Sequence, residues 1–266
     1  MIQAFRYALF NGLRQALRLR LLLPLYVCSL LLGLAQIWPL GMAAASGALH
    51  NPFLGDLASG SGDVLANLFL GNPAAPAAAG LWALALLPLT ALFGLAYNFF
   101  SGGILGVWTE TWPFWAGCRR TFWAFTGLGI LLIVLAALVL VAAVLLGWFV
   151  GIVAGLVGGF VLLQIVNLLG EYARALAVAR ERRNPLVLLR LAVAFCARRA
   201  GGVLLLGLLG LLLQLLVAGL YGVVAGLLGA SLLLVAWQQL VLLAALAVKL
   251  LRLAWAAEMS KIIPIR

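Results

Sequence analysis

Residues 121–170 contain no charged side chain, and this stretch constrains the fold more than any other part of the sequence. A single α-helix of that length would reach about 75 Å at 1.5 Å per residue. The hydrocarbon core of a bilayer is only about 30 Å thick. The stretch must therefore fold back once, and it predicts two membrane-spanning helices joined by a tight turn near Gly147 and Trp148.

The rest of the chain has the same apolar character. Of its 266 residues, 67% are hydrophobic and 9% are charged, whereas soluble domains are about half apolar and about a quarter charged. Helices are expected because lipid offers the backbone no hydrogen-bond partner, and the alternating segments of a membrane β-barrel do not occur in the sequence. We expect an all-α polytopic membrane protein with six transmembrane helices. The predicted spans are 21–45, 81–106, 122–145, 149–172, 201–222 and 231–254.

The N-terminal segment, residues 1–20, predicts an amphipathic and basic interfacial helix. Its apolar positions recur at helical spacing: Phe5, Leu9, Leu13 and Leu17. The membrane domain then covers 21–256, and a short cytoplasmic tail at 257–266 follows it.

Two prolines predict further helices at the membrane surface. Pro113 indicates the start of a short surface helix after the second span. Asn184 followed by Pro185 fits an N-cap and the first helical position, and it predicts a basic helix that runs to about Arg199.

All 17 lysine and arginine residues fall on one side of this layout. They lie in the N-terminal lead-in, in the connections after spans two and four, and at the C-terminal end. The other three connections carry none. By the positive-inside rule both termini are cytoplasmic.

The arginine clusters at this predicted cytoplasmic surface are candidate contacts for anionic lipid or for a partner. Their members are Arg119, Arg120, Arg180, Arg182, Arg183, Arg190, Arg198 and Arg199. Topology and headgroup contact explain them, at about 1 kcal/mol per residue near the surface. A docking platform for a cytoplasmic partner is the alternative, and nucleic acid is not an expected partner.

Four polar side chains follow one face of the fourth span, because the intervals between them are three, four and three residues. They are Gln164, Asn167, Glu171 and Arg174. Ionisable groups at membrane depth are costly and usually functional, so this stripe is the candidate binding site. The alternative is that Glu171 pairs with Arg174 at the interface while the amides bond to neighbouring helices.

A glycine recurs at every fourth residue around the predicted turn: Gly147, Gly151, Gly155 and Gly159. Small residues at this spacing form a groove where another helix approaches closely. A helix of the same chain and a helix of a second protomer both fit, so a homo-oligomer is an open alternative.

The sequence lacks the residues that catalysis or metal binding requires. Its cysteines lack metal-type spacing and are expected to be packing residues: Cys28, Cys118 and Cys196. The GSGD at 60–63 matches a pattern of intramembrane aspartyl proteases, but no span supplies the second aspartate. In the outer loop, 47–80, His50, Asp56 and Asp63 match no known metal site. We expect no enzymatic activity, no cofactor and no metal.

Two stretches carry a family resemblance: FSGGILGVWTETWPFWAGCRRTFWAFTGLGILL at 100–132 and NLLGEYARALAVARERRNPLVLLRLAVAFCARRAGG at 167–202. A glycine-containing helix leads to a basic aromatic segment and a span, and later an acidic residue with Tyr-Ala-Arg precedes a basic amphipathic helix. This order resembles that of uncharacterised bacterial six-helix integral membrane proteins, similar to the membrane domain joined to some glycerophosphodiester phosphodiesterases and to related domains of unknown function. The resemblance implies this architecture and a bacterial inner membrane, without implying a reaction.

These features favour a non-catalytic scaffold or accessory subunit that binds membrane lipid or another membrane protein through its glycine-lined faces. The alternative is a transporter or permease component in which polar residues line a path. That path would use Gln164, Asn167, Glu171 and either Asn98 or Gln238.

Overall fold

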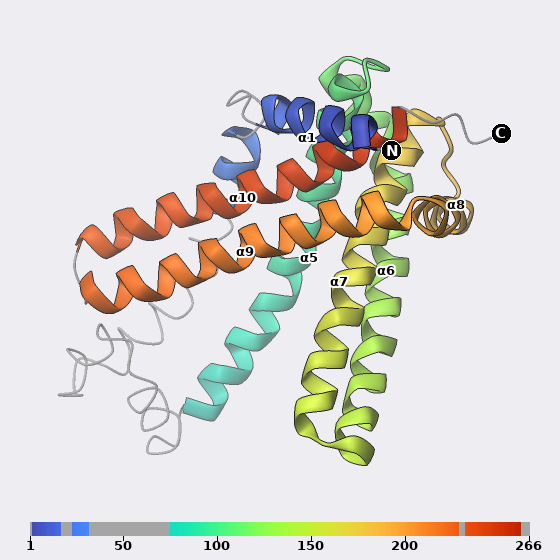
Figure 1. Cartoon of the computed structure of the whole chain (residues 1–266). Helices are drawn as coiled ribbons and strands as arrows, with labels where there is room; N and C mark the ends of the chain where they lie inside the picture. The colour runs from blue at the N-terminus through green and yellow to red at the C-terminus, as the bar shows by residue number, and fades with distance from the viewer. Residues whose placement is uncertain (1, 17–22, 32–74, 229–231, 262–266) are drawn as a thin grey trace. The chain divides into compact units, whose positions relative to one another are not determined.

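The computed structural model describes residues 2–16, 23–31, 75–228 and 232–261, and these are helical apart from short turns. No strand occurs among them. The labelled helices (Figure 1) are α1 (Ile2–Ala16), α5 (Ala75–Trp108), α6 (Phe114–Val150), α7 (Ile152–Ala179), α8 (Pro185–Arg198), α9 (Ala200–Leu228) and α10 (Leu232–Lys261). The predicted all-α class is confirmed for the part of the chain that the structure describes.

Five of these helices, α5, α6, α7, α9 and α10, are long and apolar enough to cross a membrane. They correspond to the predicted spans two to six and indicate a multi-pass membrane protein. Of the first predicted span, 21–45, only residues 23–31 are described, and these are helical. The rest of that span and most of the outer loop lie outside the described residues.

The chain forms two compact units. The first comprises residues 1–22, 97–213 and 247–266, and the second comprises 23–96 and 214–246. In the second unit, side-chain hydrogen bonds tie the helices together: the Tyr26 hydroxyl donates to Gln239 at 3.0 Å and Gln238 donates to the Tyr221 hydroxyl at 3.4 Å. The features that bear on function lie in the first unit.

Helices α6 and α7 form an antiparallel hairpin in the first unit (Figure 1). Its turn is at Gly151, not near Gly147 and Trp148 as predicted, because α6 continues to Val150. Gly151 has φ 129° and ψ 149°, a conformation that side chains with a β-carbon rarely adopt. The glycine at this position therefore lets the chain reverse between two apolar helices.

Small residues allow the two helices of the hairpin to approach closely. A β-carbon at Gly155 would stand 2.7 Å from the Cα of Gly147, and one at Gly159 would stand 2.6 Å from the Cβ of Ala143. Three members of the predicted glycine repeat thus line the contact between α6 and α7, and the fourth, Gly151, makes the turn. The partner of this glycine face is a helix of the same chain.

The start of α6 packs on the end of α5. A β-carbon at Gly117 would stand 2.8 Å from the carbonyl oxygen of Gly102, and one at Gly103 would clash with the Cys118 sulfur. Pro113 is the N-cap of α6. The predicted separate surface helix after Pro113 is therefore wrong, because the chain runs from this contact into the third span without a break.

Helix α8 begins as predicted. The Asn184 side chain accepts hydrogen bonds from the backbone nitrogens of Leu186 and Val187 at 3.1 and 3.4 Å, and Pro185 follows at the first helical position. These bonds satisfy amide groups that a helix start leaves without partners. The helix contacts both α6 and α7.

Helix α1 packs on α10 through small residues. Ala8, Gly12 and Ala16 are buried, and a β-carbon at Gly12 would stand 2.5 Å from the Trp255 side chain. Leu13, from the predicted apolar face, is 45% exposed. These small residues line the face of α1 that packs on α10, and the prediction that the leucine side of this helix meets the membrane stays a prediction.

Candidate functional site: an arginine groove and a buried charged cluster

A groove opens where the start of α6 meets the start of α8. It has a volume of about 540 Å³ and is lined by arginine, aromatic and small side chains. Its lining residues are Ala116, Arg119, Arg120, Trp123, Ala124, Arg183 and Pro185. Arg119 and Arg120 are exposed on α6, and Arg183 is exposed in the link between α7 and α8. We call this feature the arginine groove.

A small cavity of about 40 Å³ shares Arg120 and Arg183 with the arginine groove. Glu181 and Arg182 also line it. Glu181 has a positive φ of 50°, just after α7 ends, where the chain turns toward α8. The link between α7 and α8 therefore places its own arginines, Arg182 and Arg183, beside Arg120 of α6.

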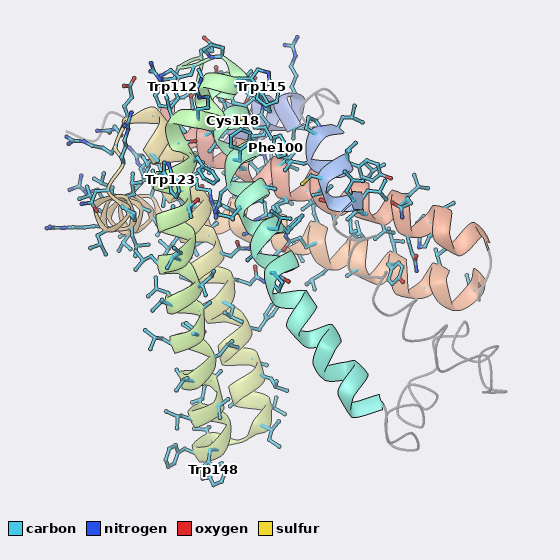
Figure 2. The ribbon with its side chains drawn as sticks, turned by 180° about the vertical axis from the view of Figure 1, so that it is seen from behind. Phe100, Trp112, Trp115, Cys118, Trp123 and Trp148 are labelled. Carbon is cyan, nitrogen blue, oxygen red and sulfur yellow. The ribbon has the colours of Figure 1, made fainter. Side chains whose placement is uncertain are left out.

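Exposed aromatic rings mark both ends of the hairpin (Figure 2). Trp115 and Trp123 are 66% and 76% exposed near the arginine groove, while Trp148 and Phe149 are 85% and 81% exposed at the opposite end. Tryptophan is enriched where a membrane protein meets the headgroup layers. The two ends thus have the composition of the two membrane interfaces.

The length of the hairpin agrees with this assignment. Gly155 faces Gly147, and Gly170 faces Leu132, so the two helices stay in register about the turn. The helix rise from the turn to Glu181 is about 45 Å at 1.5 Å per residue. A bilayer with its headgroup layers is about 40–45 Å thick. The arginine groove and the aromatic tip are therefore about one bilayer thickness apart.

The remaining predicted arginines do not line the groove. Arg190 and Arg198 are exposed on α8, Arg199 caps its C-terminus, and Arg180 caps the end of α7. The predicted group of eight is thus divided by the fold. Four arginines gather at the groove and the small cavity, and four lie elsewhere.

A second charged feature lies deeper, about 30 Å from the turn by the same helix rise. Glu171 on α7 is 4% exposed, and its Oε1 lies 3.0 Å from Nε of Arg252 on α10. Nη2 of Arg174 donates to Oδ1 of Asn98 on α5 at 3.3 Å. Three helices therefore meet through charged and polar side chains.

Tyr97 on α5 joins the same cluster through its ring. The Arg174 guanidinium carbon lies 5.4 Å from the ring centroid, and Nζ of Lys249 lies 3.8 Å from it. Cations are attracted to an aromatic face by its quadrupole. We call Tyr97, Asn98, Glu171, Arg174, Lys249 and Arg252 the buried charged cluster.

The structure changes the predicted pairing on α7. Glu171 forms its ion pair with Arg252 and not with Arg174, which bonds to Asn98 instead. Asn167 is exposed and Gln164 is half-buried, so these two amides do not enter the cluster. Of the four residues predicted as a polar stripe, only Glu171 and Arg174 belong to the buried charged cluster.

Lys249 and Arg252 were not expected in a site. Both belong to the basic residues that the sequence analysis counted at the C-terminal end of the chain. Their spacing of three residues does place them on one side of a helix, and this was the available signal. The spacing does not predict that this side of α10 faces α7, because that contact depends on the tertiary structure. Gln238, the other polar residue considered for a path, lies in the second unit and contacts Tyr221.

No protein-family model, no curated protein and no solved structure matches this chain. The resemblance to membrane domains of some glycerophosphodiester phosphodiesterases therefore stays a prediction, and function has to be argued from the two charged features.

Proposed function

We propose that this chain is a six-span protein of the bacterial inner membrane, with both termini in the cytoplasm, that acts as a non-catalytic scaffold or accessory subunit and binds anionic phospholipid. The observation that carries the proposal is the arginine groove, which combines three arginines with an exposed tryptophan at the end of a hairpin of bilayer length. A phospholipid headgroup in the adjacent leaflet is the occupant that this position favours.

The chemistry of the groove suits a phosphate diester. Guanidinium groups donate hydrogen bonds in a fork that matches phosphate oxygens. Trp123 supplies an apolar surface beside them for the start of an acyl chain, since it is exposed and lines the same groove. Basic residues near an anionic surface contribute about 1 kcal/mol each, so three of them would favour anionic over zwitterionic lipid by about a hundredfold.

The proposal can be tested by native mass spectrometry of the full chain in a mild detergent with phosphatidylglycerol or phosphatidylcholine. The groove variant carries R119Q, R120Q and R183Q. A matched control removes the same charge from α8 and its C-cap and carries R190Q, R198Q and R199Q. The groove variant is expected to lose its preference for phosphatidylglycerol, and the control is expected to keep it. Equal losses in both variants would show that net charge, and not the groove, attracts the lipid.

A second candidate is a permease component. The observation that favours it is the buried charged cluster, because ionisable groups at membrane depth commonly mark ion and substrate pathways. Reconstitution into vesicles and measurement of anion flux would test it, with E171Q as the variant that is expected to alter the flux. Unchanged flux in E171Q, or no flux at all in the unaltered protein, would remove this candidate.

A further inference from the structure

The small cavity beside the arginine groove is lined by an acidic side chain, Glu181, together with three arginines. It shares Arg120, Ala124 and Arg183 with the groove, so the two spaces adjoin. A site that selected lipids by negative charge alone would gain nothing from a carboxylate, because the carboxylate repels a phosphate. The presence of the acid therefore needs an explanation of its own.

The backbone at this position is unfavourable for glutamate. Helix α7 ends at Ala179, and the backbone nitrogen of Arg180 donates to the carbonyl oxygen of Leu176 at 2.9 Å. Glu181 follows with a φ of 50°. Glycine is the usual residue in this left-handed region after a helix, because a β-carbon disfavours the conformation. A glutamate held there indicates that its side chain contributes something that glycine would not.

The cavity has room for a small polar group next to this acid. Among the described residues, no ion pair joins the Glu181 carboxylate to Arg120, Arg182 or Arg183. The cavity volume is about 40 Å³, and one water molecule needs about 10–15 Å³ of such volume. The space therefore admits about three atoms of that size. This is enough for a hydroxymethyl group and too little for a second phosphate.

The charges around the cavity favour a neutral donor over a cationic one. An ammonium group would bind a carboxylate, but the three arginines that line the same cavity repel it. One of them, Arg120, is held over the Trp112 ring, with its guanidinium carbon 5.6 Å from the ring centroid. A hydroxyl can donate to Glu181 while its oxygen accepts from an arginine. It suits both kinds of side chain in the wall.

We propose that the arginine groove and the small cavity together recognise a phospholipid whose headgroup carries a hydroxyl, as phosphatidylglycerol does, and that Glu181 accepts a hydrogen bond from this hydroxyl. The phosphate lies in the groove, and the headgroup extends between the two spaces past Arg120 and Arg183, which line both. The inference rests on the proposed lipid binding. It adds a selection among lipids of equal charge, for which Glu181 is the specificity-determining residue.

The test compares lipids that differ in the hydroxyls of the headgroup. Native mass spectrometry of the full chain measures the binding of phosphatidylglycerol, phosphatidylpropanol and phosphatidylcholine. Phosphatidylpropanol has the same charge and the same three headgroup carbons as phosphatidylglycerol but no headgroup hydroxyl. The unaltered protein is expected to bind phosphatidylglycerol about threefold to tenfold more tightly than phosphatidylpropanol, because a hydrogen bond to a charged acceptor is lost in the latter. Both are expected to bind more tightly than phosphatidylcholine.

The variant E181G is expected to bind the two anionic lipids equally. Glycine suits the φ of 50° at this position, so E181G is expected to fold, with a thermal midpoint no lower than that of the unaltered protein. The matched control is E110G. Glu110 is exposed, has a φ of 57° and lies outside the lining of both spaces. This control loses the same charge from the same backbone conformation and is expected to keep the preference for phosphatidylglycerol.

The outcomes separate this inference from the lipid binding on which it rests. If the unaltered protein bound phosphatidylglycerol no more tightly than phosphatidylpropanol, but both more tightly than phosphatidylcholine, the inference would be overturned and the lipid binding would stand. No preference for either anionic lipid over phosphatidylcholine would overturn both. A preference that persists in E181G, or that E110G loses equally, would show that Glu181 does not accept the hydroxyl.

Discussion

Nε of Arg252 on α10 lies 3.0 Å from Oε1 of Glu171 on α7, and the two side chains are 3% and 5% exposed. Removing one partner of a buried ion pair leaves the other charge without compensation, which costs about 3–5 kcal/mol. We expect R252Q to lower the free energy of unfolding by this amount. Thermal unfolding in detergent, followed by helical circular dichroism, would measure the loss.

The double variant E171Q/R252Q separates the ion pair from simple packing. It removes both charges, so we expect it to be more stable than R252Q alone. R190Q, an exposed arginine on α8, serves as the control and should unfold as the unaltered protein does. If the double variant were as unstable as R252Q, the contact would matter through the Arg252 stem packed on Gly210 and not through charge.

The hairpin of α6 and α7 was predictable because it follows from the length of the charge-free stretch. A charge-free stretch of 121–170 is too long for one span, whichever helix packs beside it. The position of the turn was not predictable to the residue, since the segment from Gly147 to Gly151 has a glycine at each end. Only the backbone shows that Gly151, with φ 129°, makes the reversal.

The contacts within the buried charged cluster could not be predicted in this way, because they join different helices. Helical spacing placed Glu171 and Arg174 on one face of α7, and this was sufficient to identify them as candidate residues. Spacing within a helix does not say which other helix faces it. The contact between Glu171 and Arg252 joins residues far apart in sequence, and no local pattern encodes it.

The glycine contact in the hairpin predicts a size-dependent effect. In G155A the new β-carbon would stand 2.6 Å from the carbonyl oxygen of Ala143 and 2.7 Å from the Cα of Gly147. Both neighbours are backbone atoms, so the helices must move apart. We expect a loss of about 1–3 kcal/mol, the usual cost of overpacking, measured as a lower thermal midpoint.

The same substitution at Gly222 on α9 is the matched control. A β-carbon there meets no atom of the described residues within 4 Å, and alanine is favoured over glycine inside a helix by about 1 kcal/mol. G222A should therefore unfold at the same temperature as the unaltered protein or slightly above it. An equal loss in G155A and G222A would mean that helix contact is not what the glycine provides.

The proposed orientation predicts opposite labelling of the two ends of the first unit. The native cysteines are first replaced by alanine: Cys28, Cys118 and Cys196. W148C, at the exposed tip of the hairpin, should react with a membrane-impermeant maleimide in intact spheroplasts facing the outer solution. R190C, exposed on α8, should react only after the membrane is permeabilised.

Labelling of both positions in intact spheroplasts, or of neither, would place α8 and the hairpin tip in one compartment. That result would contradict the proposed six-span layout. Labelling of R190C alone would keep the layout but reverse its direction, and the positive-inside argument for cytoplasmic termini would then be wrong.

Cys196 on α8 predicts a specific dependence of alkylation on pH. The helix packs on α7, where the rings of Phe195 and Tyr172 lie 5.5 Å apart, and burial raises the pKa of the Cys196 thiol to about 12. The thiolate is the reactive form, and below its pKa the thiolate fraction rises tenfold per pH unit. With Cys28 and Cys118 replaced, we expect the rate of iodoacetamide modification to keep rising between about pH 7 and pH 10.

The control is R190C with Cys196 also replaced, because this exposed position on the same helix should reach a plateau above the ordinary thiol pKa of about 8.5. A plateau for Cys196 at the same pH as for R190C would show that α8 does not pack against α7 in the membrane.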